Sequence, residues 1–120
     1  MTLQEVMNQT VYAVAGDTVN PEKFAAKIKS GLLESGYTAY GVGKELASFD
    51  EVPEEIDIID LCMRADRALE LLKNTTKAYK CVVVQPGAES PELLTWLDEQ
   101  NIPYLQNCLL VGMKTYPRTK

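Results

Sequence analysis

The sequence predicts an α/β domain in which helices cover both faces of a parallel β-sheet. Five short segments rich in apolar and β-branched residues alternate along the chain with segments of helical apolar periodicity. The strand segments are nearly continuous apolar runs, which is typical of parallel strands buried on both faces. Because crossovers between parallel strands are right-handed, this alternation predicts a Rossmann-like, doubly wound sheet of about five strands in a three-layer αβα arrangement. We expect residues 1–120 to form one domain of this kind.

The first third of the chain is expected to contain a short helix, a strand and a longer helix. Residues 2–9 carry apolar side chains at helical spacing, and residues 10–15 (TVYAVA) form a β-branched run that favours a buried strand. Asn20 is a good N-cap and Pro21 suits a first helical position, so the longer helix is expected to begin there. Gly36 is expected to end it as a left-handed C-cap.

Four further strands and two further helices are expected in the rest of the chain. The strands are predicted over residues 37–42 (YTAYGV), 56–61 (IDIIDL), 79–84 (YKCVVV) and 102–105 (IPYL). An apolar helical face over residues 65–72 follows the second of these strands. Ser90 and Pro91 open the other helix as its N-cap and first-turn proline, and Asn101 closes it. The tail over residues 114–120 is polar and is expected to fray.

Composition and charge argue against nucleic-acid and membrane partners. The net charge is −5 and the pI is near 4.7, whereas a protein that neutralises nucleic-acid phosphates needs a basic face. The apolar runs are too short to span a membrane, and residues 1–5 (MTLQE) lack the basic-then-apolar order of a secretory signal. These features and the sparse cysteines favour a cytoplasmic protein. A homodimer is compatible with the sequence.

The absence of histidine removes most acid–base mechanisms. A Ser-His-Asp triad, a Cys-His pair and an imidazole base are excluded, because the sequence contains no histidine. The three cysteines are odd in number and widely spaced without a CxxC motif, so neither a disulfide framework nor a zinc knuckle is expected. The sequence therefore favours a binding protein over an enzyme, with no catalytic residue and no metal ligand that can be singled out.

Unusual residues gather where the expected strands end. Ligands of open α/β sheets bind beyond the carboxyl ends of the strands. Gly16 and the helix behind it form a natural anion site, because free backbone N–H groups and the helix dipole point at it. The dinucleotide fingerprint GxGxxG is absent, and no acidic residue ends the second strand, which weighs against NAD.

The segment over residues 16–24 (GDTVNPEKF) resembles the opening of the small CoA-binding domain proteins, which are related to the N-terminal domain of the succinyl-CoA synthetase α subunit. Further blocks that resemble this family are residues 36–37 (GY), 52–61 (VPEEIDIIDL), 84–87 (VQPG) and 107–108 (NC). The resemblance covers nearly the whole chain. It implies the same fold and a ligand that is coenzyme A or an acyl-CoA.

The resemblance also implies where such a ligand binds. In these domains the loop after the first strand cradles the pyrophosphate, the end of the second strand faces the adenosine, and the loop after the third strand forms a wall of the cleft. The turn after the fourth strand lines the route of the pantetheine arm. The cofactor-binding residues implied in this way are Gly16, Asp17, Thr18, Lys23, Phe24, Gly41, Val42, Gly43, Lys44, Cys62, Met63, Arg64, Gln85, Pro86 and Gly87.

Departures from the family pattern keep other functions open. Asp17 stands where the family has a small residue, and a carboxylate beside a pyrophosphate costs affinity unless it is turned away or paired. Residues 42–44 (VGK) replace the family's VNP, and the connection that follows them is short. The leading hypothesis is non-catalytic binding of CoA or an acyl-CoA. The alternatives are a nucleotide-free protein-interaction or regulatory module on the same fold, and an NAD(H)-binding sensor.

Overall fold

A five-stranded, all-parallel sheet forms the centre of the molecule. The computed structural model describes residues 1–118. The strands are β1 (Val11–Gly16), β2 (Thr38–Gly43), β3 (Ile58–Cys62), β4 (Cys81–Val84) and β5 (Tyr104–Gln106). Their spatial order is β2-β1-β3-β4-β5, so the chain leaves β1 in one direction to form β2 and then crosses back to form β3 on its other side. This is the doubly wound α/β sheet that the sequence predicts.

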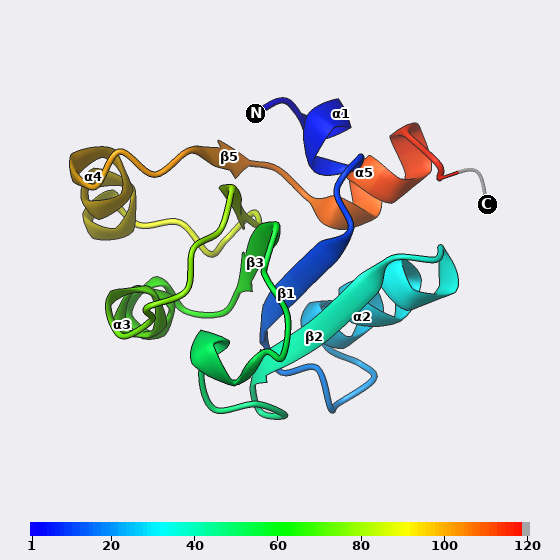
Figure 1. The fold of residues 1–120 in the computed structure, drawn as a ribbon, viewed down its shortest axis with the longest axis horizontal. Coiled ribbons are helices and arrows are strands. Elements are labelled where there is room, and N and C mark those ends of the chain that lie inside the picture. The colour runs from blue at the N-terminus through cyan, green and yellow to red at the C-terminus, as the bar shows by residue number, and fades with distance from the viewer. Residues whose placement is uncertain (119–120) are drawn as a thin grey trace.

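Helices cover both faces of this sheet. They are α1 (Leu3–Val6), α2 (Phe24–Glu34), α3 (Ala65–Lys73), α4 (Pro91–Glu99) and α5 (Leu109–Thr115), together with the 3₁₀ helix η1 (Phe49–Glu51). In Figure 1, α3 and α4 lie on one side of the strands, and α1, α2 and α5 lie on the other. The three-layer arrangement expected from the sequence is therefore present.

The two faces bury separate apolar clusters. One cluster packs η1, α3 and α4 against the sheet, with Ile59 and Leu61 as its contribution from β3. The other packs α1, α2 and α5 against the opposite face, to which β3 contributes Ile58. This alternation along one strand follows from the two-residue period of β-structure, and it means that Asp60 faces the second cluster.

Two helix boundaries differ from the sequence-based expectation. The long helix α2 begins at Phe24, not at Pro21, because Asn20 accepts a hydrogen bond from the N–H of Glu22 and closes a local turn before the helix. Its end is as expected, since Gly36 has left-handed backbone (φ 89°). The first helix is confined to Leu3–Val6, shorter than the expected residues 2–9.

The described part of the C-terminal segment forms a helix and contacts the rest of the domain through Arg118. Helix α5, which the sequence analysis did not anticipate, extends through Thr115. The guanidinium of Arg118 lies over the ring of Tyr37, 4.4 Å from its centroid, and donates a hydrogen bond to the carbonyl of Gln9. Of the tail over residues 114–120 that the sequence predicts to fray, residues 119–120 lie outside the described part of the chain.

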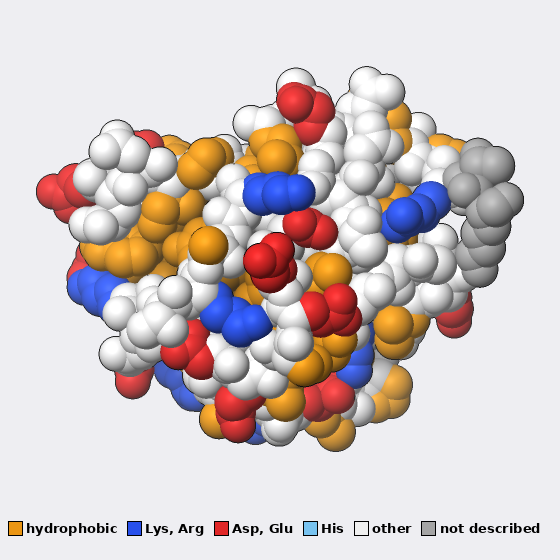
Figure 2. Space-filling view, in the orientation of Figure 1, with side chains coloured by type: hydrophobic (Ala, Val, Ile, Leu, Met, Phe, Trp, Pro, Cys, Tyr) orange, Lys and Arg blue, Asp and Glu red, His pale blue; other side chains and the backbone are white. Residues whose placement is uncertain are grey.

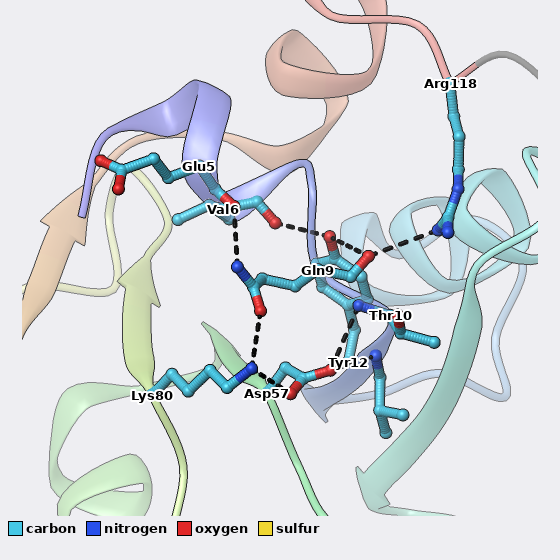
Figure 3. A network of polar contacts seen from close by, with 9 residues as sticks. Glu5, Val6, Gln9, Thr10, Tyr12, Asp57, Lys80 and Arg118 are labelled. Carbon is cyan, nitrogen blue, oxygen red and sulfur yellow. Dashed lines mark hydrogen bonds and ion pairs between the residues drawn. The ribbon is translucent and has the colours of Figure 1, made fainter.

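A polar network closes the amino end of the sheet (Figure 3). The Asp57 carboxylate accepts hydrogen bonds from the backbone N–H groups of Thr10 and Val11, and it forms an ion pair with Lys80 at 3.1 Å. Lys80 also donates to the side-chain oxygen of Gln9. The Tyr12 hydroxyl donates to the carbonyl of Val6 at 2.6 Å. These bonds join the start of β1 to β3 and β4.

The side of the molecule seen in Figure 2 shows no large patch of side chains with the same charge. Basic and acidic side chains are interspersed there, and hydrophobic side chains gather between α3 and α4. None of the helices within residues 1–118 is long and apolar enough to cross a membrane.

Candidate functional site

The carboxyl edge of the sheet is shaped by the close approach of β1 and β3. Gly16 ends β1 and pairs in register with Cys62 at the end of β3. A Cβ atom on Gly16 would lie 2.5 Å from the carbonyl oxygen of Cys62 and 2.9 Å from the Cβ of Ala25. The close approach of the two backbones at the switch point of the sheet therefore requires glycine at position 16.

A cavity of about 210 Å³ opens at this switch point. Its walls come from the ends of β1 and β2, the loop after β3 and the first turn of α3. The lining residues are Gly16, Asp17, Gly43, Lys44, Met63, Arg64 and Arg67. Three cations and one carboxylate therefore surround a space that also has an apolar wall.

The side chains of two of these cations form no hydrogen bond or ion pair in the described part of the chain. Arg64 forms an ion pair with Asp66 at 2.9 Å, and both side chains are largely exposed, so water screens the pair. Within residues 1–118, no hydrogen bond or ion pair engages the side chain of Lys44 or Arg67. Unpaired lysine and arginine side chains at the mouth of a cavity suit a phosphate group.

The carboxylate of Asp17 is directed into its own loop. It accepts hydrogen bonds from the backbone N–H groups of Asn20 at 3.0 Å and Val19 at 3.1 Å. The bond from Asn20 is the main reason that the pKa of this carboxyl is lowered, and the nearby charges of Lys44 and Lys23 act in the same direction. Asp17 thus occupies two backbone N–H groups of the loop that, by the family resemblance, would cradle a pyrophosphate.

Thr18 and Gly41 meet beside the cavity and do not line it. The Thr18 hydroxyl donates to Glu45 at 2.6 Å, and Lys29 forms an ion pair with the same carboxylate at 2.7 Å. The hydrogen bonds from Lys29 and Thr18 lower the pKa of Glu45. Gly41 leaves the space for this group, because a Cβ there would lie 2.1 Å from the Thr18 oxygen.

Three further residues of the expected site lie outside the cavity. Phe24 is 66% exposed on the first turn of α2, with the ammonium of Lys27 5.6 Å from its ring centroid. Lys23 is exposed at the position just before α2. Val42 is fully buried in the apolar core, so a ligand can reach only its backbone.

A second cavity, of about 260 Å³, continues from the first. Two segments line it, Cys62-Met63-Arg64 after β3 and residues 85–88 after β4. Met63 and Arg64 border both cavities. The cleft therefore runs along the carboxyl edge of the sheet from the loop after β1 to the turn after β4, and it brings together ten of the expected residues along with Arg67 and Ala88. These ten residues are Gly16, Asp17, Gly43, Lys44, Cys62, Met63, Arg64, Gln85, Pro86 and Gly87.

Two residues of this region, Arg67 and Asp60, are not among the cofactor-binding residues that the resemblance implies. Arg67 lies three residues after Arg64, a spacing that places both near one helix face, and this spacing was the available signal. Asp60 is a fully buried carboxyl in the middle of β3, and it accepts a hydrogen bond from Gln85, which lines the second cavity. The signal for it was an aspartate inside the apolar run IDIIDL.

Burial raises the pKa values of two groups beside the cleft, Asp60 and Cys62, and so favours their uncharged forms. Burial raises the pKa of Asp60 to about 7, against the opposing hydrogen bond from Gln85 at 2.6 Å. Burial, the Asp60 carboxyl and the Cys108 thiol raise the pKa of Cys62 to about 11. A thiol with such a pKa is a poor nucleophile at neutral pH. Within residues 1–118, no three acidic or thiol side chains come together as metal ligands.

Comparison with known proteins identifies related sequences and folds. The family model described as a CoA binding domain matches residues 10–114. A conserved hypothetical protein from Pyrococcus furiosus is 25% identical, with a TM-score of 0.76 over 86% of this chain and 98% of that one. The Thermus thermophilus protein described as cell-free ID.343 is 24% identical, with a TM-score of 0.80 over 97% of this chain and 99% of that one. No curated protein matches the sequence.

A larger enzyme contains a similar fold as one part. The dinucleotide-forming acetyl-coenzyme A synthetase 1 of Ca. Korarchaeum cryptofilum is 21% identical, with a TM-score of 0.70 over 88% of this chain but only 27% of the synthetase. At this identity the similarity shows the fold alone.

Proposed function

This chain belongs to the CoA-binding domain family, and we propose that it binds coenzyme A or an acyl-CoA in the cleft at the carboxyl edge of its sheet, without catalysing a reaction. The observation that carries this proposal is the polarity of the cleft. Its first cavity holds Lys44 and Arg67, and Arg64 borders both cavities. The rest of the second cavity is bordered by uncharged residues, Cys62, Met63 and the turn after β4. CoA has the same polarity, with phosphates at one end and a neutral pantetheine arm at the other.

The first cavity suits the phosphates of the ligand. Arginine can form two parallel hydrogen bonds with a phosphate, and lysine adds a point charge. Arg64 joins them by exchanging its exposed ion pair with Asp66 for the ligand, since such pairs contribute little to stability. These side chains give the cavity the positive charge that an acidic protein of net charge −5 otherwise lacks.

The second cavity suits the pantetheine arm and its thiol or thioester. Cys62 and Met63 supply an uncharged wall, and Pro86 and Gly87 form a turn whose backbone is exposed. Burial keeps the Cys62 thiol protonated, so it does not attack a bound thioester at neutral pH. These features support binding without catalysis.

A calorimetric titration of the ligand-stripped protein with CoA tests the proposal. We expect one-to-one binding at micromolar affinity or better, weaker binding of dephospho-CoA because it lacks the 3′-phosphate, and no binding of NADH. Absence of saturable binding by CoA and its thioesters would overturn the proposal. Competition by NADH for the same site would instead favour an NAD(H) sensor.

A second candidate function follows from Asp17. Its carboxylate already occupies two N–H groups of the loop after β1, so the loop is satisfied without an anion. On this reading the domain has lost its nucleotide and serves as a protein-interaction or regulatory module. Retention of CoA through purification from cells would count against it.

The proposed setting is cytoplasmic, with a small molecule and not a nucleic acid as the partner. The net charge of −5 and the interspersed charges of Figure 2 support this setting, because a nucleic-acid binder presents a basic face. A homodimer is compatible with it, and light scattering of the purified protein with and without CoA measures the oligomeric state.

A further inference from the structure

The buried carboxyl of Asp60 has one hydrogen-bond partner, although its two oxygens could accept more hydrogen bonds. It lies at the centre of the sheet, in register with Val14 of β1 on one side and Val83 of β4 on the other. Its Oδ1 accepts a hydrogen bond from the Nε2 of Gln85 at 2.6 Å. Its Oδ2 is the one buried side-chain oxygen or nitrogen in residues 1–118 that has no hydrogen-bond partner. Such a group is costly to bury, which points to a role outside stability.

Gln85 connects this carboxyl to the cleft. The residue is 5% exposed and lies at the end of β4, where it forms part of the wall of the second cavity. A side-chain amide has a donor end and an acceptor end, and only one of them can face Asp60. A carboxylate only accepts hydrogen bonds, so an ionised Asp60 holds Nε2 and turns the Oε1 of Gln85 the other way.

We propose that Asp60 is a positioning residue that sets which end of the Gln85 amide the cleft presents to its ligand. When Asp60 is a carboxylate, Gln85 presents Oε1 as an acceptor for an N–H group, such as the amides of a pantetheine arm. When Asp60 is a carboxylic acid, its O–H can donate to Oε1, and the amide is then free to present N–H groups instead. The role assigned to the ligand rests on the proposed function, whereas the coupling of Asp60 to Gln85 does not.

The surroundings of Asp60 make it the group that changes its protonation state in the Asp60–Gln85 pair. Of the Asp, Glu, Lys and Arg side chains in residues 1–118, Asp60 alone is fully buried. Burial raises the pKa of Asp60 to about 7, so both forms are populated near neutral pH. Titratable groups of the apolar cluster on this face include the thiols of Cys62 and Cys81 and the hydroxyls of Tyr12 and Tyr37. The Cys108 thiol lies before α5, and the guanidinium of Arg118 lies over the Tyr37 ring. Burial raises the pKa of each of the four groups on the sheet, so they stay neutral where Asp60 titrates.

Nuclear magnetic resonance of the ligand-free protein tests the coupling directly. We expect the side-chain carboxyl carbon of Asp60 and the side-chain amide of Gln85 to shift in one common step with a midpoint near pH 7. In Asp60→Asn, which keeps the shape of the side chain but does not titrate, the Gln85 amide should show no such step. The coupling is refuted if Gln85 keeps its resonance while Asp60 titrates, or if Asp60 stays in one form between about pH 5 and pH 9.

Calorimetry with CoA tests the consequence for binding. Between pH 8 and pH 6 we expect the affinity of the native chain to fall by about twofold to tenfold more than that of Asp60→Asn. The comparison uses the same ligand, so the titration of CoA itself cancels between the two proteins. Parallel pH profiles would overturn the role in binding. If neither protein binds CoA, the proposed function fails, and the resonance experiment still decides whether Asp60 controls Gln85.

Discussion

Two aspartates three residues apart show how differently the two ends of the sheet are built. Asp57 precedes β3 at the amino end, where Thr10, Val11 and Lys80 all donate to its carboxylate. Although burial acts to raise its pKa, these partners lower it overall. Asp60 lies in the middle of β3, and its single hydrogen-bond partner, Gln85, follows β4 at the carboxyl end. Burial raises the pKa of Asp60 to about 7. Asp57 is thus held as a carboxylate, whereas Asp60 changes its protonation state near neutral pH.

The contrast extends to the neighbouring groups. At the amino end, hydrogen bonds and an ion pair connect separate segments of the chain and satisfy one another (Figure 3). At the carboxyl end, Lys44 and Arg67 face a cavity without a partner among residues 1–118. Paired groups stabilise a fold, whereas unpaired groups around a cavity are available to a ligand. Changes at the amino end are therefore expected to affect stability without affecting binding, whereas the charged groups at the carboxyl end are expected to govern binding.

The largest expected effect concerns the pH dependence of stability set by Asp60. Its pKa is near 7 in the folded protein and near 3.8 when unfolded, so the folded state binds more protons between these values. The free energy of unfolding should therefore fall as the pH rises from about 4 to 7, by up to about 4 kcal/mol from this group. Asp60→Asn should remove that fall, which urea denaturation at pH 5 and pH 8 measures. An equal pH dependence in both proteins contradicts the raised pKa.

Gly16→Ala should destabilise the carboxyl edge by about 3 kcal/mol, because the added Cβ meets the Cys62 carbonyl at 2.5 Å. Gly87→Ala is the matched control. Gly87 also has positive φ (91°), but no atom lies within 4 Å of the added Cβ, so its cost should be about 1 kcal/mol. Thermal unfolding measures both. Equal losses in the two variants would show that backbone conformation, not the contact with Cys62, decides the residue at position 16.

Asp57→Ala should destabilise the amino end by about 2 kcal/mol, since it leaves two backbone N–H groups without their acceptor. Lys80→Ala, which removes only a half-exposed partner, should cost less than about 1 kcal/mol. Neither variant should change the affinity for CoA, measured by calorimetry on the folded proteins. A weaker CoA complex in Asp57→Ala would show that the two ends of the sheet are coupled.

Arg67→Ala should weaken CoA binding by about tenfold, because it removes a cation without a protein partner from the first cavity. Arg118→Ala is the control, since it removes the same charge from the opposite end of the sheet, where Arg118 lies over Tyr37. Its affinity should remain within about twofold of the native value. Equal losses in the two variants would indicate a general charge effect and no phosphate contact at Arg67.

The smallest expected effect is an increase in the affinity for CoA. Asp17→Asn keeps an oxygen that can accept from Val19 and Asn20 but removes the negative charge at the first cavity. CoA should bind about twofold to fivefold more tightly, and the gain should shrink at high salt. Weaker binding by this variant would mean that the carboxylate orders the loop in a way that the amide cannot replace.

Much of the fold could be predicted from the sequence, because its signals are local. The apolar runs of β1, β3 and β4 differ clearly from the helical periodicity between them. Ser90 caps α4 through a hydrogen bond from Leu93, as its sequence position predicts. The start of α2 was wrong by three residues, since the turn at Asn20 competes with the helix for the same backbone groups. Helix α5 has no strong cap or period and was missed.

The candidate site could be predicted only as a set of strand ends. Loops after parallel strands meet at one edge of the sheet, so the sequence placed Gly16, Lys44 and Arg64 near one another. It could not show that Thr18 turns toward Glu45, or that Val42 enters the core. These outcomes depend on side-chain directions that are decided by packing and not by neighbours in the sequence.

The sequence alone determined the class of the fold, the C-terminal end of α2, the capping of α4, and the exclusion of histidine chemistry, because composition, periodicity and capping act over a few residues. Only the tertiary structure decided the strand order β2-β1-β3-β4-β5, and with it the pairs that matter here. That order brings Gly16 against Cys62, Asp60 against Gln85 and Asp57 against Thr10. Each pair joins segments more than twenty residues apart, and contacts at that separation arise from which strands pair in space, a property that no local pattern records.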